Sequence, residues 1–206
     1  ATAIAPARPS RACGVYGVVT GRPHRGPPDV PTPSLGITTA READAEALLL
    51  LRRSVLAEGC WFATRADEHR AGLDQTRATV AGLLSQPNGT LLVATMDGRV
   101  VGMLAVHGEP LVRMRHVGRL EMMVVRRARG CGVGTALLRA CLSWAEANPM
   151  LRKLSLAVFV DNVAAVGLYR RHGFVQEGRR EGEYLLEDGT PRADLLMARD
   201  VCGGGA

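Results

Sequence analysis

The sequence predicts an α/β fold in which a mixed sheet of six to seven strands carries helices on both faces. Seven short apolar stretches have the length and pattern of strands, and four longer ones repeat at helical spacing. Short turns join the early strands, whereas helices separate the later ones. Turns connect antiparallel neighbours and helical crossovers connect parallel ones, so the sheet should contain both kinds of pairing.

Length and composition predict one globular domain. The 206 residues are 47% hydrophobic and 22% charged. Residues 1–34 hold seven of the eleven prolines and a net charge of +3, so we expect a flexible Pro/Arg-rich tail before a domain at 35–201 and a short tail at 202–206. The remaining charge is too small to favour nucleic-acid binding, and no apolar run is long enough to span a membrane. Five scattered cysteines predict reduced thiols in the cytoplasm and no metal site.

The first half of the domain should contain a strand, two helices and a hairpin. A strand at 35–38 precedes a helix with a capping box at Thr39–Glu42, which ends at Gly59. A second helix is predicted at 67–85, before Pro87-Asn88-Gly89. Strands at 91–95 and 100–107 flank Asp97-Gly98, which is typical of a tight hairpin turn.

The second half alternates strands and helices before a last hairpin. The predicted elements are a strand at 117–125, a helix at 136–148, a strand at 154–160, a helix from 161 to 173, and strands at 174–186 and 193–201. The last two strands flank the turn Asp188-Gly189.

Residues 129–135, Arg-Gly-Cys-Gly-Val-Gly-Thr, stand between a predicted strand and a predicted helix. Glycines let the backbone approach a ligand, and the first turn of a helix has unpaired N–H groups, so the stretch indicates a phosphate or pyrophosphate site. It lacks the lysine of a Walker loop, and its evenly spaced glycines do not match G-x-G-x-x-G. For these residues alone, a helix start without a ligand is the preferred interpretation.

A second string, Asn162–Phe174, changes that balance. It opens with the asparagine of a predicted helix, carries a Leu-Tyr pair and ends with Gly-Phe. The two strings together resemble the GCN5-related N-acetyltransferase (GNAT) superfamily, whose Arg-x-x-Gly-x-Gly loop is matched by Arg129, Gly132 and Gly134. The last hairpin is similar to the Rim-type and phosphinothricin-type branches. The resemblance covers about 35–201.

The resemblance implies a GNAT fold in which strands four and five splay apart and hold the pantetheine arm of acetyl-CoA. Main-chain groups near Val124 would bind that arm, and a bulge near Met122–Met123 would open the gap. The arginines at 126–129 would face the phosphates. The implied cofactor-binding residues are Met123, Val124, Arg129, Gly130, Cys131, Gly132, Val133, Gly134, Thr135 and Asn162.

Two residues are candidates for catalysis. Tyr169 taken alone is a helix-core aromatic, but at its spacing the family uses it as the acid that protonates the departing thiolate. Glu121 interrupts an apolar strand and is either a general base or a residue of the solvated face. The alternative bases are His116, Glu109 and Glu177. Asn162 can cap its helix as well as face the cofactor, and Cys131 has no placed partner as a nucleophile.

We therefore expect an acetyl-CoA-dependent N-acetyltransferase whose acceptor, a primary amine, attacks the thioester directly. The acceptor is a small molecule or a protein N-terminus, and a homodimer is possible. The alternative is a catalytically weak acyl-CoA-binding regulatory or sensor module of the same fold. A Rossmann-type nucleotide binder ranks third because the glycine spacing does not fit it.

Overall fold

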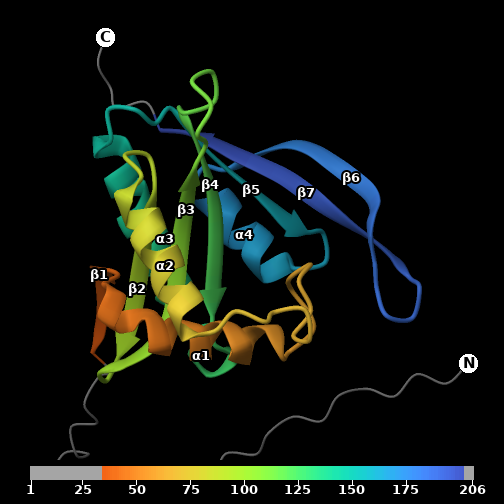
Figure 1. The fold of residues 1–206 in the computed structure, drawn as a ribbon. Helices are drawn as coiled ribbons and strands as arrows, with labels where there is room; N and C mark the ends of the chain where they lie inside the picture. The colour runs from red at the N-terminus through yellow and green to blue at the C-terminus, as the bar shows by residue number, and fades with distance from the viewer. Residues whose placement is uncertain (1–33, 202–206) are drawn as a thin grey trace, which may run out of the picture. The chain divides into compact units, whose positions relative to one another are not determined.

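A computed structural model of the chain describes residues 34–201. The predicted tails at 1–34 and 202–206 lie outside the described residues, except for Ser34. The element order is the predicted one (Figure 1). It runs β1 (Leu35–Thr39), α1 (Ala45–Leu56), α2 (Leu73–Ser85), β2 (Thr90–Met96), β3 (Arg99–Gly108), β4 (Val117–Val124), α3 (Val133–Ala147), β5 (Lys153–Phe159), α4 (Val163–Arg171), β6 (Val175–Leu185) and β7 (Pro191–Asp200).

The seven strands form one mixed sheet in the order β1-β2-β3-β4-β5-β7-β6. Only β4 and β5 are parallel, and they pair over three positions, from Val117↔Lys153 to Arg119↔Ser155. Beyond those positions β5 continues along β7 as far as Phe159↔Asp194, while β4 continues along β3. The expected splay of strands four and five is therefore confirmed.

The expected bulge near Met122–Met123 is wrong. Strand β4 stays in unbroken register with β3 from Gly102↔Val124 to Gly108↔Gly118. The gap opens because β4 and β5 each follow a different neighbour, so no extra residue in β4 is needed to separate them.

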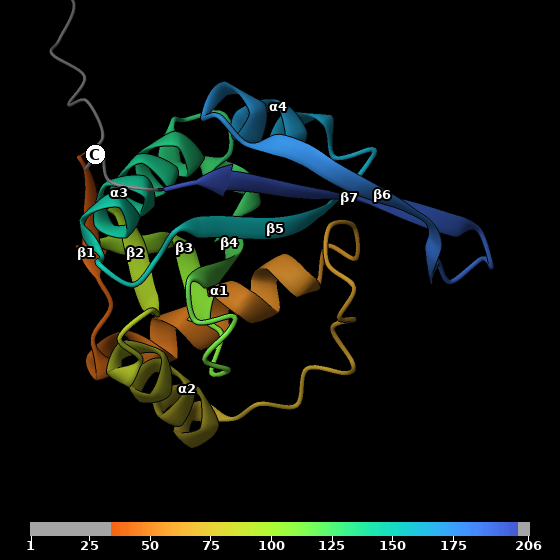
Figure 2. The same cartoon turned by 90° about the horizontal axis from the view of Figure 1, so that it is seen from above.

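Helices cover both faces of the sheet, as predicted. Figure 2 shows α1 and α2 on one face and α3 and α4 on the other. Helix α1 buries a stripe that includes Leu48, Leu51 and Val55, and α3 buries Leu137 and Cys141 completely. These stripes repeat at three- and four-residue spacing, which places them on the side of each helix that meets the sheet. No helix among residues 34–201 has the length and apolar character needed to cross a membrane.

The boundaries differ from prediction at the start of three helices. Thr39 continues the β1 ladder opposite Leu92, so the capping box at Thr39–Glu42 is wrong; instead the Asp44 carboxylate accepts from the Arg41 N–H at 2.7 Å. The second helix begins at Leu73, six residues later than predicted, because the stretch before it has no large apolar side chain to pack on the sheet. Helix α3 begins at Val133, inside the glycine loop.

The two hairpins form where predicted. Asp97 and Gly98 have φ angles of 50° and 75°, the left-handed conformations that a two-residue hairpin turn requires. The hairpin of β6 and β7 extends beyond the other strands (Figure 1). Its register shifts between Arg180 and Tyr184, which leaves three residues of β6 unpaired.

Candidate active site

A cavity of about 760 Å³ lies where β4 separates from β5. Its size is in the usual range for small-molecule and cofactor sites. It is walled by both strands, the glycine loop, α4, the loop after α1 and the last hairpin. Ten of the twelve candidate residues line it: Glu121, Met123, Val124, Arg129, Gly130, Gly132, Gly134, Thr135, Asn162 and Tyr169. The side chains of Cys131, which is exposed, and Val133, which is buried, are not part of the lining.

The main chain of β4 offers polar groups to the gap. The Val125 N–H donates to the Val101 carbonyl at 3.0 Å, so this pair belongs to the ladder with β3. Alternate residues of an antiparallel strand turn their main-chain groups to opposite sides, so Met123 also pairs with β3 whereas Met122 and Val124 turn toward β5. At these positions β5 has moved away, which leaves free donors and acceptors on the gap side. Met122 was not among the expected cofactor residues; the alternation could have indicated it.

The glycine loop presents a row of main-chain donors. The N–H groups of residues 130–135 have no acceptor in the described part of the chain; the first helical bond is from the Ala136 N–H to the Gly132 carbonyl, at 3.0 Å. Gly132 caps the helix with φ of 82°, and a Cβ on Gly130 or Gly132 would meet no atom within 4 Å. Free amides, open space and the positive end of α3 suit a pyrophosphate.

Arg129 is already paired within the protein. Its Nη1 and Nη2 atoms lie 2.6 and 2.9 Å from the two carboxylate oxygens of Glu58, and its Nε donates to the Val124 carbonyl at 2.9 Å. These bonds tie the glycine loop to the end of α1 and to the exit of β4. The same contact occupies the Val124 carbonyl, so the Val124 N–H is the group left facing the gap.

Helix α4 contributes Asn162 and Tyr169. The Asn162 Oδ1 accepts from the Ala165 N–H at 3.2 Å and so caps the helix, while the residue also lines the cavity. Tyr169 is 6% exposed and packs on Phe174 with ring centroids 5.6 Å apart. Burial, reinforced by Cys141 and Glu121, raises the pKa of its hydroxyl above the ordinary value. Tyr169 therefore stays protonated and able to donate.

Glu121 faces α1 and is held by two basic side chains. Its Oε1 lies 2.7 Å from the Arg52 Nη2, and its Oε2 lies 3.8 Å from the His107 Nε2. Burial by itself would raise the pKa of this carboxyl, but the nearby His107 and the charge and hydrogen bond of Arg52 outweigh it and lower the pKa. The carboxylate is therefore ionised, and sequence reasoning did not find Arg52 or His107.

The three alternative bases lie elsewhere. Glu109 pairs with Arg119, and the Glu177 Oε1 lies 2.5 Å from the Lys153 Nζ. Neither these two residues nor His116 lines the cavity. Glu121 is thus the one candidate base of the four that reaches it.

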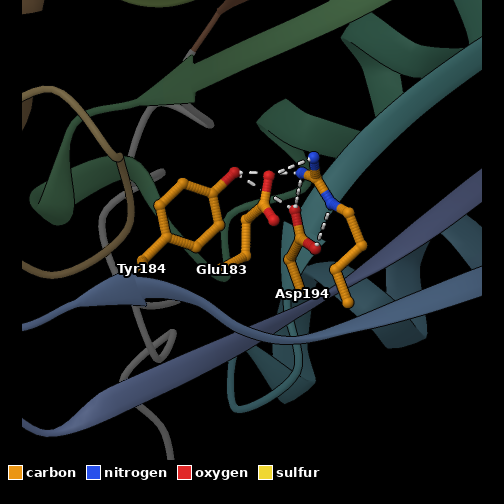
Figure 3. Close-up of polar contacts among 4 residues, drawn as sticks. Glu183, Tyr184 and Asp194 are labelled. Carbon is orange, nitrogen blue, oxygen red and sulfur yellow. Dashed lines mark hydrogen bonds and ion pairs between the residues drawn. The ribbon is translucent and has the colours of Figure 1, made fainter.

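A polar cluster supports the far end of the cavity, and sequence reasoning missed it. Figure 3 shows Tyr184 and Asp194 turned toward one another. The Tyr184 hydroxyl donates to the Asp194 Oδ2 at 3.2 Å, and Arg180 donates to both oxygens of Asp194. Asp194 is 1% exposed, so this pairing offsets the cost of burying its charge.

The split between β4 and β5 beside a cradle of free amides is the arrangement that the resemblance to the GNAT superfamily implies for an acetyltransferase. The chain matches the Acetyltransferase (GNAT) family over residues 55–174, more than half its length, and belongs to that family. It is 34% identical over 117 residues to the L-amino acid N-acetyltransferase AaaT of Escherichia coli (strain K12), a match that covers 57% of this chain and 72% of that protein. The protein is therefore an N-acetyltransferase with acetyl-CoA as donor.

The fold is similar to those of solved acetyltransferase structures. A GNAT-family acetyltransferase from Streptococcus pneumoniae superposes with a TM-score of 0.78 at 30% identity, covering 81% of this chain and 99% of that one. A ribosomal-protein-alanine N-acetyltransferase from Brucella melitensis gives 0.69 at 25% identity, over 80% and 98% of the two chains. A phosphinothricin acetyltransferase from Sinorhizobium meliloti, solved with acetyl-CoA, shares the fold with a TM-score of 0.74 at 18% identity, over 82% and 90%.

Proposed function

We propose that the protein transfers the acetyl group of acetyl-CoA to a primary amine by direct attack of the amine on the thioester. One observation carries the proposal: a single cavity joins a row of free amides at 130–135, the free Val124 N–H and an ionised carboxylate at Glu121. The first group suits the pyrophosphate, the second the thioester carbonyl and the third the acceptor.

Each group has one task in the reaction. The amides at 130–135 bind phosphate oxygens, and Asn162 and the main chain of Met122 and Val124 bind the pantetheine arm. The Val124 N–H donates to the thioester oxygen, where negative charge develops as the amine attacks. Glu121 takes the proton of the incoming ammonium through water, and the neutral amine then attacks. Tyr169 gives its proton to the departing sulfur and takes back the proton that the acylated nitrogen loses.

The acceptor is a primary amine of a small molecule or of a protein N-terminus. The Escherichia coli relative acts on L-amino acids and the Brucella melitensis relative on ribosomal-protein alanine, so both sizes occur among related proteins. The acceptor would bind between the loop after α1 and the last hairpin, because Trp61–Ala63, Tyr184 and Asp194 line the cavity. The loop between β3 and β4, residues 109–116, contributes no residue to the lining.

The test is a panel of primary amines incubated with acetyl-CoA and the protein, with free thiol as the readout. We expect thiol release above the rate without amine for at least one member, and an acetylated product of matching mass. If no amine raises the rate while acetyl-CoA still increases the melting temperature, the protein is an acyl-CoA-binding module, and the proposal is overturned.

A further inference from the structure

The aromatic residues of this chain gather around the cavity. Only eight of the 206 residues are aromatic, yet five of these eight line it. They are Trp61, Phe62, Phe159, Tyr169 and Tyr184. Such a concentration in an aromatic-poor chain calls for a reason beyond general packing.

Packing of the main core accounts for only two of the five. Tyr169 belongs to the hydrophobic core and Phe62 packs against it, but Trp61, Phe159 and Tyr184 are not part of that cluster. Phe159 is nevertheless buried, with 7% of its surface exposed. These three come from the loop after α1, from the end of β5 and from β6. The rings of Phe159 and Tyr184 meet edge to face with centroids 5.0 Å apart, and the Tyr184 hydroxyl is held by Asp194.

Arg192 contacts the rings of both Trp61 and Phe159 and so links two walls of the cavity. Its guanidinium carbon lies 3.9 Å from the Phe159 ring centroid and 5.2 Å from that of Trp61. Two of its nitrogens bond the Asp161 carboxylate, and its Nη1 donates to the Cys60 carbonyl at 2.6 Å. A planar guanidinium can stack on rings and fork onto a carboxylate at once, which lysine cannot do. The side chain is 11% exposed, as expected of an anchor.

The charged groups beside these rings are all paired. Arg192 is bound by Asp161, Arg180 by Asp194, and Arg52 by Glu121. An acceptor therefore need not bring a charge of its own to this end of the cavity. The aromatic surface available to it comes mainly from Trp61 and Tyr184, which are half-buried, while Phe159 is buried behind Arg192 and Tyr184.

We propose that Trp61, Phe159 and Tyr184 form an acceptor subsite for an aromatic ring attached next to the reacting amine, and that Arg192 is a positioning residue that holds the Trp61 and Phe159 walls in place. The inference rests on the proposed function and names its substrate class. The ring is the shared chemistry of aromatic amino acids and of arylalkylamines, and the two sources differ by a carboxylate.

The test compares matched acceptors, phenylalanine against alanine and phenylethylamine against ethylamine, at equal concentrations of free amine. We expect kcat/KM to be at least about tenfold higher for the ring-bearing member of one or both pairs, because a buried ring gains both area and aromatic contacts. The pair with the larger rates identifies the source of the ring. Equal kcat/KM within both pairs overturns the proposal and leaves the proposed function intact.

Substitutions distinguish the role of Trp61, which contacts the acceptor ring, from that of Arg192, which positions Trp61 and Phe159. Trp61→Ala should reduce the ring preference to about twofold or less, and Trp61→Phe should retain most of it. Arg192→Lys should raise KM for the ring-bearing acceptor about tenfold with kcat and the Kd of acetyl-CoA unchanged. Arg77→Lys is the matched control, since Arg77 also pairs with an aspartate but lies on α2, outside the cavity lining. A ring preference that survives Arg192→Lys with unchanged KM contradicts the anchoring role.

A binding measurement distinguishes failure of the subsite from failure of the reaction. The chain has two tryptophans, so Trp144→Phe leaves Trp61 as the single tryptophan. Phenylethylamine and phenylalanine should change its fluorescence in the presence of CoA, and ethylamine and alanine should not. A ring-specific change without acetyl transfer supports the subsite and overturns the proposed function; no change and no ring preference overturns the subsite.

Discussion

At the scale of single residues, Tyr169 combines burial with a place in the cavity lining. Its raised pKa keeps the proton on the hydroxyl at neutral and mildly alkaline pH. Tyr169→Phe should therefore lower kcat about a hundredfold, the usual contribution of a general acid, with the Kd of acetyl-CoA unchanged. Single-turnover rates and equilibrium binding check this, and an unaltered kcat would remove Tyr169 from the mechanism.

Glu121 makes a different prediction because its lowered pKa keeps it ionised as a base. As pH falls below the pKa of the acceptor amine, free amine becomes scarce and proton removal by Glu121 matters more. Glu121→Gln should lose about a hundredfold in kcat/KM at low pH and approach the parent at high pH, where the amine is already neutral. Glu177→Gln is the control, since Glu177 pairs with Lys153 outside the cavity lining. Parallel pH profiles for parent and Glu121→Gln would assign the proton to bulk water.

Local spacing predicts which residues lie near one another, and Asn162 and Tyr169 both line the cavity, while their roles stay predictions. Asn162 and Tyr169 lie in one helix, so their separation in sequence determines their separation in space. Arg52 and Arg192 gave no such signal, because they reach Glu121 and Cys60 across 69 and 132 residues of sequence. Those contacts depend on how α1 and β7 approach the cavity, which no local pattern encodes.

At the scale of elements, substitutions at two glycines can distinguish the effect of backbone strain from the effect of lost ligand contact. Gly132 and Gly98 both have positive φ, and a Cβ added to either would have no atom within 4 Å, so alanine at either site costs about 1 kcal/mol of conformational energy. Only Gly132 lies in the cavity lining. Both substitutions should lower the melting temperature by similar amounts, but only Gly132→Ala should weaken acetyl-CoA binding. Calorimetric titration checks this, and equal affinity in the two variants would move the phosphate site away from this loop.

Element prediction was accurate for strands and less so for helix starts. Every strand was placed within two residues at both ends, because alternating apolar residues and turn residues are local signals. The predictions of helix starts were wrong where tertiary packing outweighed such a local signal. Thr39 is a residue type that can cap a helix, but it pairs with Leu92 in the β1–β2 ladder instead. Residues 67–72 are mostly of types that occur in helices, but they have no large apolar side chain that could pack on the core.

At the scale of the whole molecule, the described residues complete a seven-stranded sheet in which β1 is an edge strand. Ser34 still belongs to it, because its N–H donates to the Asp97 carboxylate and its carbonyl accepts from the Asp97 N–H, each at 3.3 Å. A chain that begins at Pro33 keeps these bonds, whereas one that begins at Ala40 loses all of β1.

We therefore expect removal of residues 1–32 to leave the melting temperature and acetyl transfer unchanged. Removal of residues 1–39 should lower the melting temperature by several degrees, because it exposes the β2 edge and the core residues that β1 covers. Thermal unfolding and thiol release on the two truncated chains test this, and light scattering on the same samples determines whether the protein is a homodimer. An equal loss in both truncations would show that residues 1–32 stabilise the domain, which would overturn their prediction as a dispensable tail.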